Sequence, residues 1–385
     1  MIILHEPDRS GIVPVPIQPA RRGASGVALR QEVSIWFSVS SPTAQQPLQR
    51  TAAAVILALA FIALAPALHA EGAPSLDSIT MTVSDLDAST AFYEEVLGFR
   101  RVSSAEVAGD PWERLYGTFA LRIRFVRLAL GSEAIELREF LAPRGHPIPD
   151  DARSNDRSFQ HVAIIVSDME AAYARLREHG VRHASSGPQR LPDWNPNAGG
   201  IEAFYFRDPD GHPLEILRFP AGKGEARWQA RESLFLGIDH TAIVVRATER
   251  ASGFYGSALG MRVTGASENY GTEQEHLNAV FAARLRITAM RGSAGPGVEF
   301  LEYLSPSDGR PSPPGLRPFD LAATETTLIV PDAEAAARAV AGAGGSWISP
   351  GAIATPGREL GFFRGALVRD ADGHFVRFIE KEQQP

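Results

Sequence analysis

Histidine and carboxylate side chains carry the candidate chemistry of this sequence, because its 385 residues include 10 histidines and no cysteine. The absence of cysteine excludes disulfide scaffolds, thiolate-held zinc, iron–sulfur clusters and thiol catalysis. Any metal must therefore be held by imidazole, carboxylate or backbone oxygen. Two imidazoles with two carboxylates suit Ni²⁺, Co²⁺, Fe²⁺, Mn²⁺ or Zn²⁺. The net charge of −7 argues against a nucleic-acid partner, which needs a surplus of lysine and arginine.

Two short segments look like ligand clusters but are better explained as turns. Asp208, Asp210, Gly211 and His212 form the first, and Asp370, Asp372 and His374 repeat it. An Asp-Gly pair supplies the left-handed residue that a tight hairpin requires. We therefore expect both segments to be structural turns.

An internal repeat organises the sequence. Residues 76–100 match residues 238–262 at an offset of 162, and residues 134–143 match 297–306 at an offset of 163. The two turn segments also repeat at an offset of 162. We predict two domains, 74–220 and 236–382, joined by a charged linker over residues 221–235.

Each half divides again into two modules of the order β-α-β-β-β. The alternation in residues 161–166 predicts a strand with Val162, Ile164 and Val166 on one face. The helix that follows from Met169 has Asp168 as its expected N-cap and stops at Gly180. The aromatic pairs Phe92-Tyr93 and Phe254-Tyr255 follow helical spacing, and we expect them in the core.

The N-terminal residues do not belong to this repeat. Residues 52–68 are uncharged and apolar, follow Arg50 and precede small residues, which is typical of a secretory signal. We predict a cleaved signal over residues 51–70, an exported (periplasmic or secreted) protein and no stable membrane span. Residues 1–50 are expected to be unstructured or to follow a misassigned start codon.

These modules resemble the vicinal oxygen chelate superfamily, which includes glyoxalase I, extradiol dioxygenases and bleomycin resistance proteins. The resemblance covers residues 76–380 and depends on IDHTAIVV, FQHVAIIVSD, VEFLEY and FRDPDGHPLEI. It implies an α+β fold of four βαβββ modules that form two cup-shaped mixed sheets with helices outside. It also implies a small-molecule substrate, a divalent metal on the concave face, and a monomer or homodimer.

The resemblance further implies where metal ligands lie, namely near the start of a module's first strand and on its last strand. The second and third modules each offer a histidine and a glutamate, whereas the first and fourth have lost members. The first has Ser78 in place of a histidine, and Arg377 disables the last-strand position of the fourth because a guanidinium cannot bind a metal. The positions, in chain order, are Ser78 and Glu136; His161 and Glu215; His240 and Glu299; Glu325 and Arg377.

The pairing of modules decides which set can work. If modules two and three pair, the set is His161, Glu215, His240 and Glu299, as in the bacterial type of glyoxalase I, and we prefer this crossed arrangement. If modules one and two pair, the site is incomplete and includes Glu136. The absence of any metal is the third alternative.

A glyoxalase-like lyase or isomerase is the function that the resemblance favours. A chelated carbonyl would be polarised, and Glu215 and Glu299 would move the proton between adjacent carbons through an enediolate. A ring-cleaving Fe(II) dioxygenase is the first alternative, although Glu299 would crowd its open positions. The second alternative is a non-catalytic ligand-binding protein. An exported location weakens the case for a strict glutathione substrate.

Four further residues are weaker candidates for contacts with the substrate or with the metal ligands. His276 and Asn278 lie two residues apart in an expected strand over residues 275–281, and Trp194 lies in a Pro/Asn/Gly-rich loop. Tyr270 completes the set, as a candidate acid/base partner of His276 in the dioxygenase alternative.

Overall fold

The computed structural model describes residues 72–356 and 359–382, which belong to one compact unit, Ala67–Pro385. The predicted signal over residues 51–70 and the segment before it lie outside the described residues. Among the helices that are described, none combines the length and the apolar composition needed to span a membrane.

Four modules of the predicted order follow one another along the chain. Each begins with the strand that will pair with another module and continues into a helix and three or more further strands. Module 1 consists of β1 (Ser75–Thr82), α2 (Leu86–Glu95), β2 (Arg100–Ala108), α3 (Asp110–Tyr116), β3 (Arg122–Leu130) and β4 (Glu133–Ala142). Module 2 consists of β5 (Phe159–Val166), α4 (Met169–Glu178), β6 (Arg182–His183), β7 (Gln189–Arg190), β8 (Glu202–Arg207) and β9 (Pro213–Arg218).

The second half repeats this pattern. A short 3-10 helix, η1 (Ala226–Gln229), lies in the segment between the halves. Module 3 consists of β10 (Phe235–Val244), α5 (Thr248–Ser252), a π-helical turn (Gly253–Ala258), β11 (Arg262–Tyr270), α6 (Thr272–Asn278), β12 (Arg284–Arg291) and β13 (Gly297–Ser305). Module 4 consists of β14 (Thr324–Ile329), α7 (Ala333–Gly342), β15 (Ser346–Trp347), β16 (Ile353–Ala354), β17 (Arg364–Arg369) and β18 (Phe375–Glu380).

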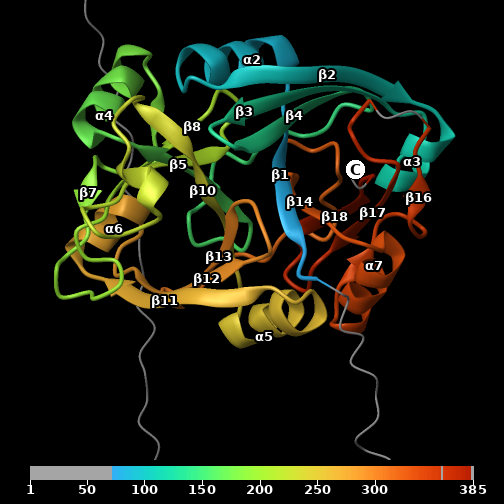
Figure 1. Cartoon of the computed structure of the whole chain (residues 1–385). Helices are drawn as coiled ribbons and strands as arrows, with labels where there is room; N and C mark the ends of the chain where they lie inside the picture. Colours follow the sequence, from blue (N-terminus) through green and yellow to red (C-terminus); the bar gives the residue numbers. More distant parts are fainter. Residues whose placement is uncertain (1–71, 357–358, 383–385) are drawn as a thin grey trace, which may run out of the picture. The chain divides into compact units, whose positions relative to one another are not determined.

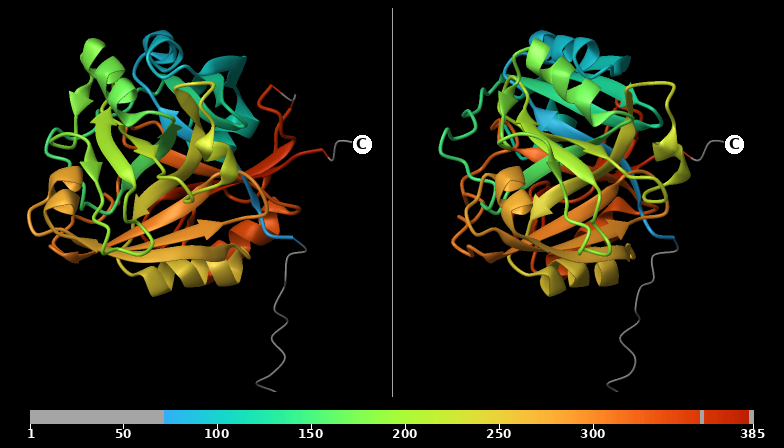
Figure 2. Two further views of the ribbon diagram at one scale, coloured as in Figure 1. Left: turned by 60° about the vertical axis from the view of Figure 1, so that its left-hand side comes forward. Right: turned by 90° about the vertical axis from the view of Figure 1, so that its left-hand side faces the viewer.

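Each of the two nine-stranded sheets takes one module from each half of the sequence. Sheet A joins modules 1 and 4 through the antiparallel pair β1–β14, and sheet B joins modules 2 and 3 through the antiparallel pair β5–β10. Figure 1 shows sheet B, with strands coloured from green (β5) to orange (β13), beside sheet A, which combines the blue to teal strands of module 1 with the orange to red strands of module 4; Figure 2 turns sheet B forward. The crossed pairing is thus confirmed, as is the α+β fold of βαβββ modules.

The alternation of apolar residues explains why these strands have one face in the core. Val162, Ile164 and Val166 of β5 belong to the main hydrophobic cluster, whereas His161 and Ala163 point to the opposite face. The same cluster receives the helices, including Met169, Ala172 and Leu176 of α4. The sheet faces away from this core are therefore free to carry polar chemistry.

Helix ends follow the predicted capping. The side chain of Asp168 accepts a hydrogen bond from the backbone N–H of Ala171, and Asp332 does the same for Ala335 at the start of α7. Gly180 adopts a φ of 63° just after α4, which explains why a glycine ends that helix.

The two Asp-x-Asp-Gly segments are turns, as predicted. One oxygen of Asp208 accepts from the backbone N–H groups of residues 210–212, and the other accepts from His212 at 2.8 Å and from the Tyr93 hydroxyl at 3.1 Å. Asp370 makes the same contacts with His374 and Tyr255. Tyr93 and Tyr255 are core residues, as expected, and each also ties the helix of one module to a turn of the next.

Candidate metal centre

Strand register brings the four predicted ligands to one face of sheet B. In the central pair, His161 of β5 lies opposite Ala242 of β10, and His240 lies opposite Ala163. Parallel pairing then places Glu215 of β9 beside Ala163, and Glu299 of β13 beside Ala242. Modules 2 and 3 therefore each contribute one imidazole and one carboxylate, from two neighbouring strands.

The side chains converge on a small volume. The Nε2 atoms of His161 and His240 are 3.2 Å apart. Oε2 of Glu215 is 3.1 Å from Nε2 of His161 and 3.8 Å from Nε2 of His240, and Oε2 of Glu299 is 3.4 Å from Nε2 of His240. Within the described residues, ligand atoms of His161, His240 and Glu299 all lie within 4.8 Å of one another. The structure thus assembles all four side chains into one cluster.

Both imidazoles are held by their other nitrogen. Nδ1 of His161 contacts Oε1 of Gln160, and Nδ1 of His240 contacts Oδ2 of Asp239 at 2.9 Å. A proton on Nδ1 in these contacts leaves Nε2 as the free lone pair in the neutral ring, which is the arrangement that metal-binding histidines use.

A set of supporting residues holds Asp239 in turn. Its Oδ1 accepts from the indole N–H of Trp228 at 3.0 Å and from the guanidinium of Arg291 at 2.7 Å. Trp228 belongs to the segment interpreted from the sequence as a linker, yet it is buried and its ring lies 3.8 Å from the Arg227 guanidinium carbon. Sequence reasoning missed Gln160, Asp239, Trp228 and Arg291; the only signal was a hydrogen-bonding residue directly before each histidine.

The electrostatics of the cluster favour a positive charge at its centre. Burial by itself lowers the pKa of His240, but Glu299, Asp239 and Glu215 raise the pKa to about 9. Burial raises the pKa of Glu299, although the two histidines oppose the shift. Oε2 of Glu215 is buried and has no hydrogen-bond donor within the described residues. An undonated carboxylate oxygen beside two converging imidazole nitrogens fits a divalent cation, so these residues suit the metal that was predicted.

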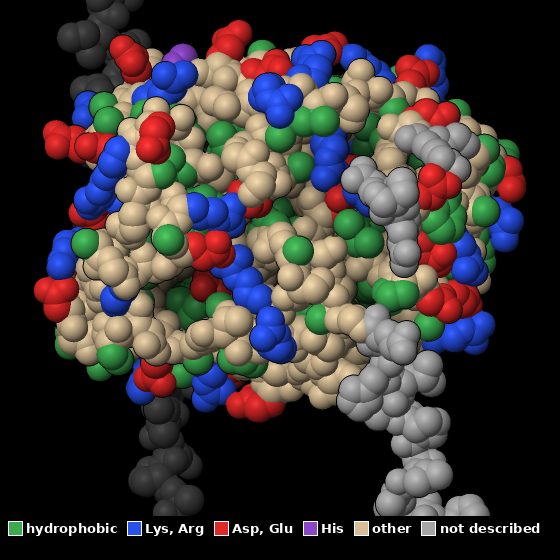
Figure 3. Space-filling model, in the orientation of Figure 1, with side chains coloured by type: hydrophobic (Ala, Val, Ile, Leu, Met, Phe, Trp, Pro, Cys, Tyr) green, Lys and Arg blue, Asp and Glu red, His purple; other side chains and the backbone are tan. Residues whose placement is uncertain are grey.

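Two tyrosines line the same face of sheet B. The ring of Tyr205 is 4.9 Å from that of His161, and the hydroxyl of Tyr303 is buried without a partner in the described part of the chain. Burial raises the pKa of both phenols, so each stays protonated at neutral pH. Figure 3 shows a hollow over sheet B in which hydrophobic side chains lie between charged ones.

The expected strand over residues 275–281 is wrong, because residues 272–278 form α6. On this helix His276 is exposed and Asn278 is fully buried, so they do not share a face. The amide nitrogen of Asn278 has no partner among the described residues, and its Oδ1 accepts from Gln274. The strand expectation failed because a short helix follows Gly271, and Ala279 at its end adopts a left-handed φ of 51°, which a strand does not have.

The remaining weaker candidates lie together at the surface. Trp194 and Tyr270 stack with ring centroids 4.5 Å apart, and both are about half exposed. Their loop and strand are joined by Asn195, which donates to Asn269 at 2.7 Å. Because Tyr270 stacks on Trp194 and His276 is exposed on α6, the structure gives no support to their acid/base pairing.

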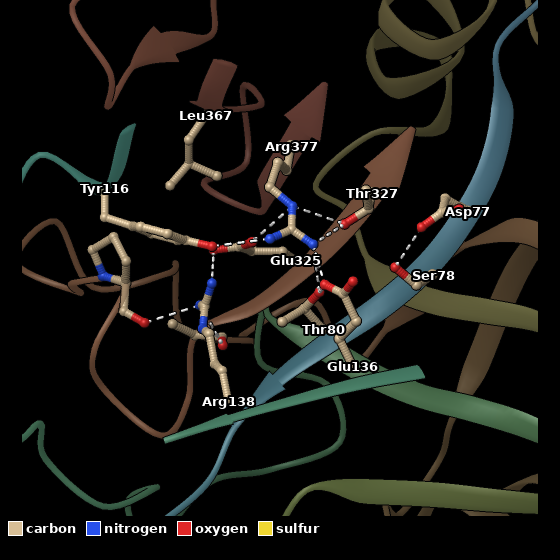
Figure 4. Close-up of polar contacts among 12 residues, drawn as sticks. Asp77, Ser78, Thr80, Tyr116, Glu136, Arg138, Glu325, Thr327, Leu367 and Arg377 are labelled. Carbon is tan, nitrogen blue, oxygen red and sulfur yellow. Dashed lines mark hydrogen bonds and ion pairs between the residues drawn. The ribbon is translucent and has the colours of Figure 1, made fainter. Parts of the chain in front are cut away.

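Glu136, the alternative first-half ligand, lies in sheet A and not with His161. It belongs to the companion site, defined here as Ser78, Glu136, Glu325 and Arg377 on the equivalent strands. Arg377 contacts Glu136, donates to the Tyr116 hydroxyl at 2.9 Å and to Thr327 at 3.0 Å. Arg138 contacts Glu325, and Figure 4 shows the two ion pairs side by side. This centre is filled by its own side chains.

Comparisons with known proteins agree with this architecture. The family model described as "Glyoxalase/Bleomycin resistance protein/Dioxygenase superfamily" matches residues 75–216 and again 237–378. A 2-epi-5-epi-valiolone epimerase from an Actinomyces species is 34% identical over 158 residues, which are 39% of this chain and 82% of that protein. Glutathione transferase FosA from Serratia marcescens is 27% identical over 176 residues, 44% of this chain and 96% of that protein.

Structural similarity extends over more of the chain. Glyoxalase I from Zea mays superposes with a TM-score of 0.50 and 17% sequence identity, covering 80% of this chain and 92% of that one. At this identity the likeness establishes the fold alone. The repeated family match, which covers more than half of the residues, shows that this chain belongs to the glyoxalase/bleomycin resistance protein/dioxygenase superfamily.

Proposed function

We propose that this chain is a metal-dependent lyase or isomerase of the glyoxalase I type, acting on a small oxygenated substrate. The observation that supports the proposal best is the convergence of two imidazole Nε2 atoms and two glutamates on one point, with one glutamate oxygen undonated. His161, Glu215, His240 and Glu299 would hold the cation. A bound divalent cation would polarise a substrate carbonyl and acidify the adjacent C–H.

The chain's own residues would then move the proton. The side chain of Glu299 is 20% exposed and that of Glu215 is 4% exposed, so Glu299 is the more accessible of the two carboxylates to a substrate. Burial raises the pKa of Glu299, which makes the carboxylate a better proton acceptor. We assign proton abstraction to Glu299 and proton return to Glu215.

An epimerase is the second candidate. Removal of a proton beside a carbonyl and its return to the opposite face needs the same two carboxylates. The 34% identity to a 2-epi-5-epi-valiolone epimerase supports this variant of the reaction. The Fe(II) dioxygenase alternative is weaker, because four side chains converge where that chemistry uses three.

Metal analysis combined with solvent isotope exchange tests the proposal. Purified protein should contain about one Ni, Co, Zn, Mn or Fe ion per chain, and it should exchange the α-hydrogen of some α-hydroxy carbonyl compounds with D₂O. Glu299→Gln and Glu215→Gln should lower exchange by about 10²–10⁴-fold with unchanged circular dichroism. Full activity in both variants would exclude these roles, and oxygen consumption would favour the dioxygenase.

The proposed location is outside the cytoplasm, on the basis of the apolar segment over residues 52–68 alone. Fractionation of cells that express the full chain, with the mature N-terminus sequenced, tests this. An N-terminus near residue 71 in the exported fraction is expected, and an intact chain in the cytoplasm would contradict it.

A further inference from the structure

A separate cavity of about 210 Å³ lies at one end of sheet B. Its walls come from β5 and β8 and from the two long connections between modules, residues 143–158 and 306–323. Apolar walls include Ile148, Ala152 and Phe159. A cavity of about 150 Å³ already accepts a benzene molecule in a protein interior, so this one can hold a small ring or a short alkyl chain.

The two connections hold each other firmly, so the cavity is built into the fold. Arg310 bonds the carboxylates of Asp151 and Asp156, and Asn155 donates to Asp308 at 2.9 Å. A Cβ at Gly309 would lie 1.8 Å from the carbonyl oxygen of Asn155, so only glycine permits this approach. The cavity thus has rigid walls on the side away from the sheet.

Four arginines line the cavity, but only two have a carboxylate partner. Arg153 and Arg310 pair with Asp156 and its neighbours, whereas neither Arg157 nor Arg207 forms an ion pair with any described residue. Arg207 bonds only the carbonyl oxygen of Gly211, and burial together with the nearby Arg182 charge lowers the pKa of Arg207, although the Asp208 charge opposes the shift. Two half-buried cations that form no ion pair with a described carboxylate therefore border a largely apolar space, where an anion can pair with them.

Other polar groups at the wall also lack partners. The hydroxyl of Thr324 is buried and makes no hydrogen bond within the described chain. Gln160 contacts His161 through its Oε1, and its amide nitrogen makes no hydrogen bond within the described residues. These groups supply additional hydrogen-bond donors to an anionic head group.

In the equivalent region of module 4, side chains of the chain itself fill the corresponding space. Arg369, which is 162 residues after Arg207, bonds the carbonyl oxygen of Leu316 and lies over the ring of Phe375 at 4.5 Å. Leu316 and Phe319 pack into that cluster of apolar residues. In module 2 no described side chain takes this place, and the space stays open.

We propose that this cavity binds a small apolar carboxylic acid, with the carboxylate between Arg157 and Arg207 and the hydrocarbon part against Ile148, Ala152 and Phe159. The site is distinct from the His/Glu cluster, but two residues of its wall also contact His161 of that cluster. Gln160 contacts His161, and Tyr205 packs against its ring. A ligand in the cavity would therefore contact the residues that orient His161.

Isothermal titration calorimetry with octanoate tests the proposal, using chelator-treated protein so that the result does not depend on the metal centre. We expect one octanoate per chain, weaker binding of 1-octanol and no binding of acetate. The double variant Arg157→Gln/Arg207→Gln should lower octanoate affinity at least ten-fold and leave octanol affinity unchanged. Arg369→Gln is the matched control and should bind octanoate as the unmodified chain does.

Filling the cavity provides a second arm. Ala152→Trp, or Ser312→Trp on the opposite connection if the first variant does not fold, should abolish binding of both octanoate and octanol. Absence of octanoate binding to the unmodified chain would overturn the proposal. Equal octanoate binding by the double arginine variant, or binding that survives the tryptophan substitutions, would also overturn it.

Discussion

The His/Glu cluster of sheet B and the companion site of sheet A occupy equivalent positions and balance their buried carboxylates differently. Both central strand pairs have the same register, with Ala242 opposite His161 in one and Thr80 opposite Glu325 in the other. In each sheet, the last strand of each module adds one residue at the equivalent position. The correspondence is His161 with Glu325, His240 with Ser78, Glu215 with Arg377 and Glu299 with Glu136.

Charge explains the contrast. In sheet B two carboxylates meet two imidazoles, which leaves two negative charges for a divalent cation when the imidazoles are neutral. In sheet A two carboxylates meet the guanidinium groups of Arg138 and Arg377, all four being buried. The arginines thus supply permanently the two positive charges that a cation would supply in sheet B. The comparison teaches that the same strand arrangement can carry either an open cluster of candidate metal ligands or a closed set of buried ion pairs.

Breaking the companion ion pairs should have the largest effect. Arg377→Met leaves Glu136 and Glu325 buried with fewer positive partners, and we expect the free energy of unfolding to fall by about 3–5 kcal/mol. Urea denaturation measures this change. Arg284→Met removes an exposed pair with Glu268 and should change stability by less than about 1 kcal/mol. A fall no larger than in this control would show that the buried ion pairs stabilise the protein no more than an exposed pair does.

Converting one site into the other would sharpen the comparison. A variant with Ser78→His, Glu325→His, Arg377→Glu and Arg138→Leu recreates the ligand set of sheet B, with leucine as at Leu301. We expect the metal content to rise from about one to about two ions per chain, measured by plasma mass spectrometry. A folded variant that keeps one ion would show that register and residue type are not sufficient.

The supports of the histidines should have a smaller effect. Asp239→Asn removes the charged partner of His240 Nδ1, and metal affinity should fall by about 10–100-fold, since such orienting groups have effects of this size. Competition with a chromogenic chelator measures it. Asp77→Asn at the equivalent place in sheet A should leave metal affinity unchanged. Equal affinities in Asp239→Asn and the unmodified chain would contradict the orienting role.

The smallest expected effect concerns pH and the two buried Asp–His turns. Burial lowers the pKa of His212 and of His374, but Asp208 and Asp370 raise each pKa above 6.5 overall. A raised folded-state pKa stabilises the protein below pH 6.5, and this stabilisation is lost as the pH rises through the folded-state pKa. We expect a lower melting temperature at pH 9 than at pH 6.

The matched variant His212→Asn/His374→Asn should show a smaller difference between these two pH values, measured by differential scanning calorimetry on chelator-treated protein. The contribution of His240 is common to both proteins and cancels in the comparison. An unchanged pH difference in the variant would exclude the two turns as its source.

Much of the fold and of the ligand set could be predicted from the sequence. The repeat at an offset of 162, the alternation in β5 and the cap at Asp168 are local patterns that act within one element, and each is confirmed. The helix α6 could not be separated from a strand, because it is only seven residues long and a segment of that length does not distinguish the two periods. The packing of Trp228 against Asp239 could not be predicted because it joins a loop to a strand.

The sequence by itself determined which residues can hold a metal and which cannot. It contains no thiolate, two histidine–glutamate pairs and one arginine in a ligand position, and residue chemistry settles those facts. Only the tertiary structure decided that modules 2 and 3 pair across the two halves. That pairing is decided by the hydrogen-bond register between β5 and β10, which no local pattern encodes. The same register brings four side chains from four strands to one point, and its counterpart in sheet A closes the second site with arginine.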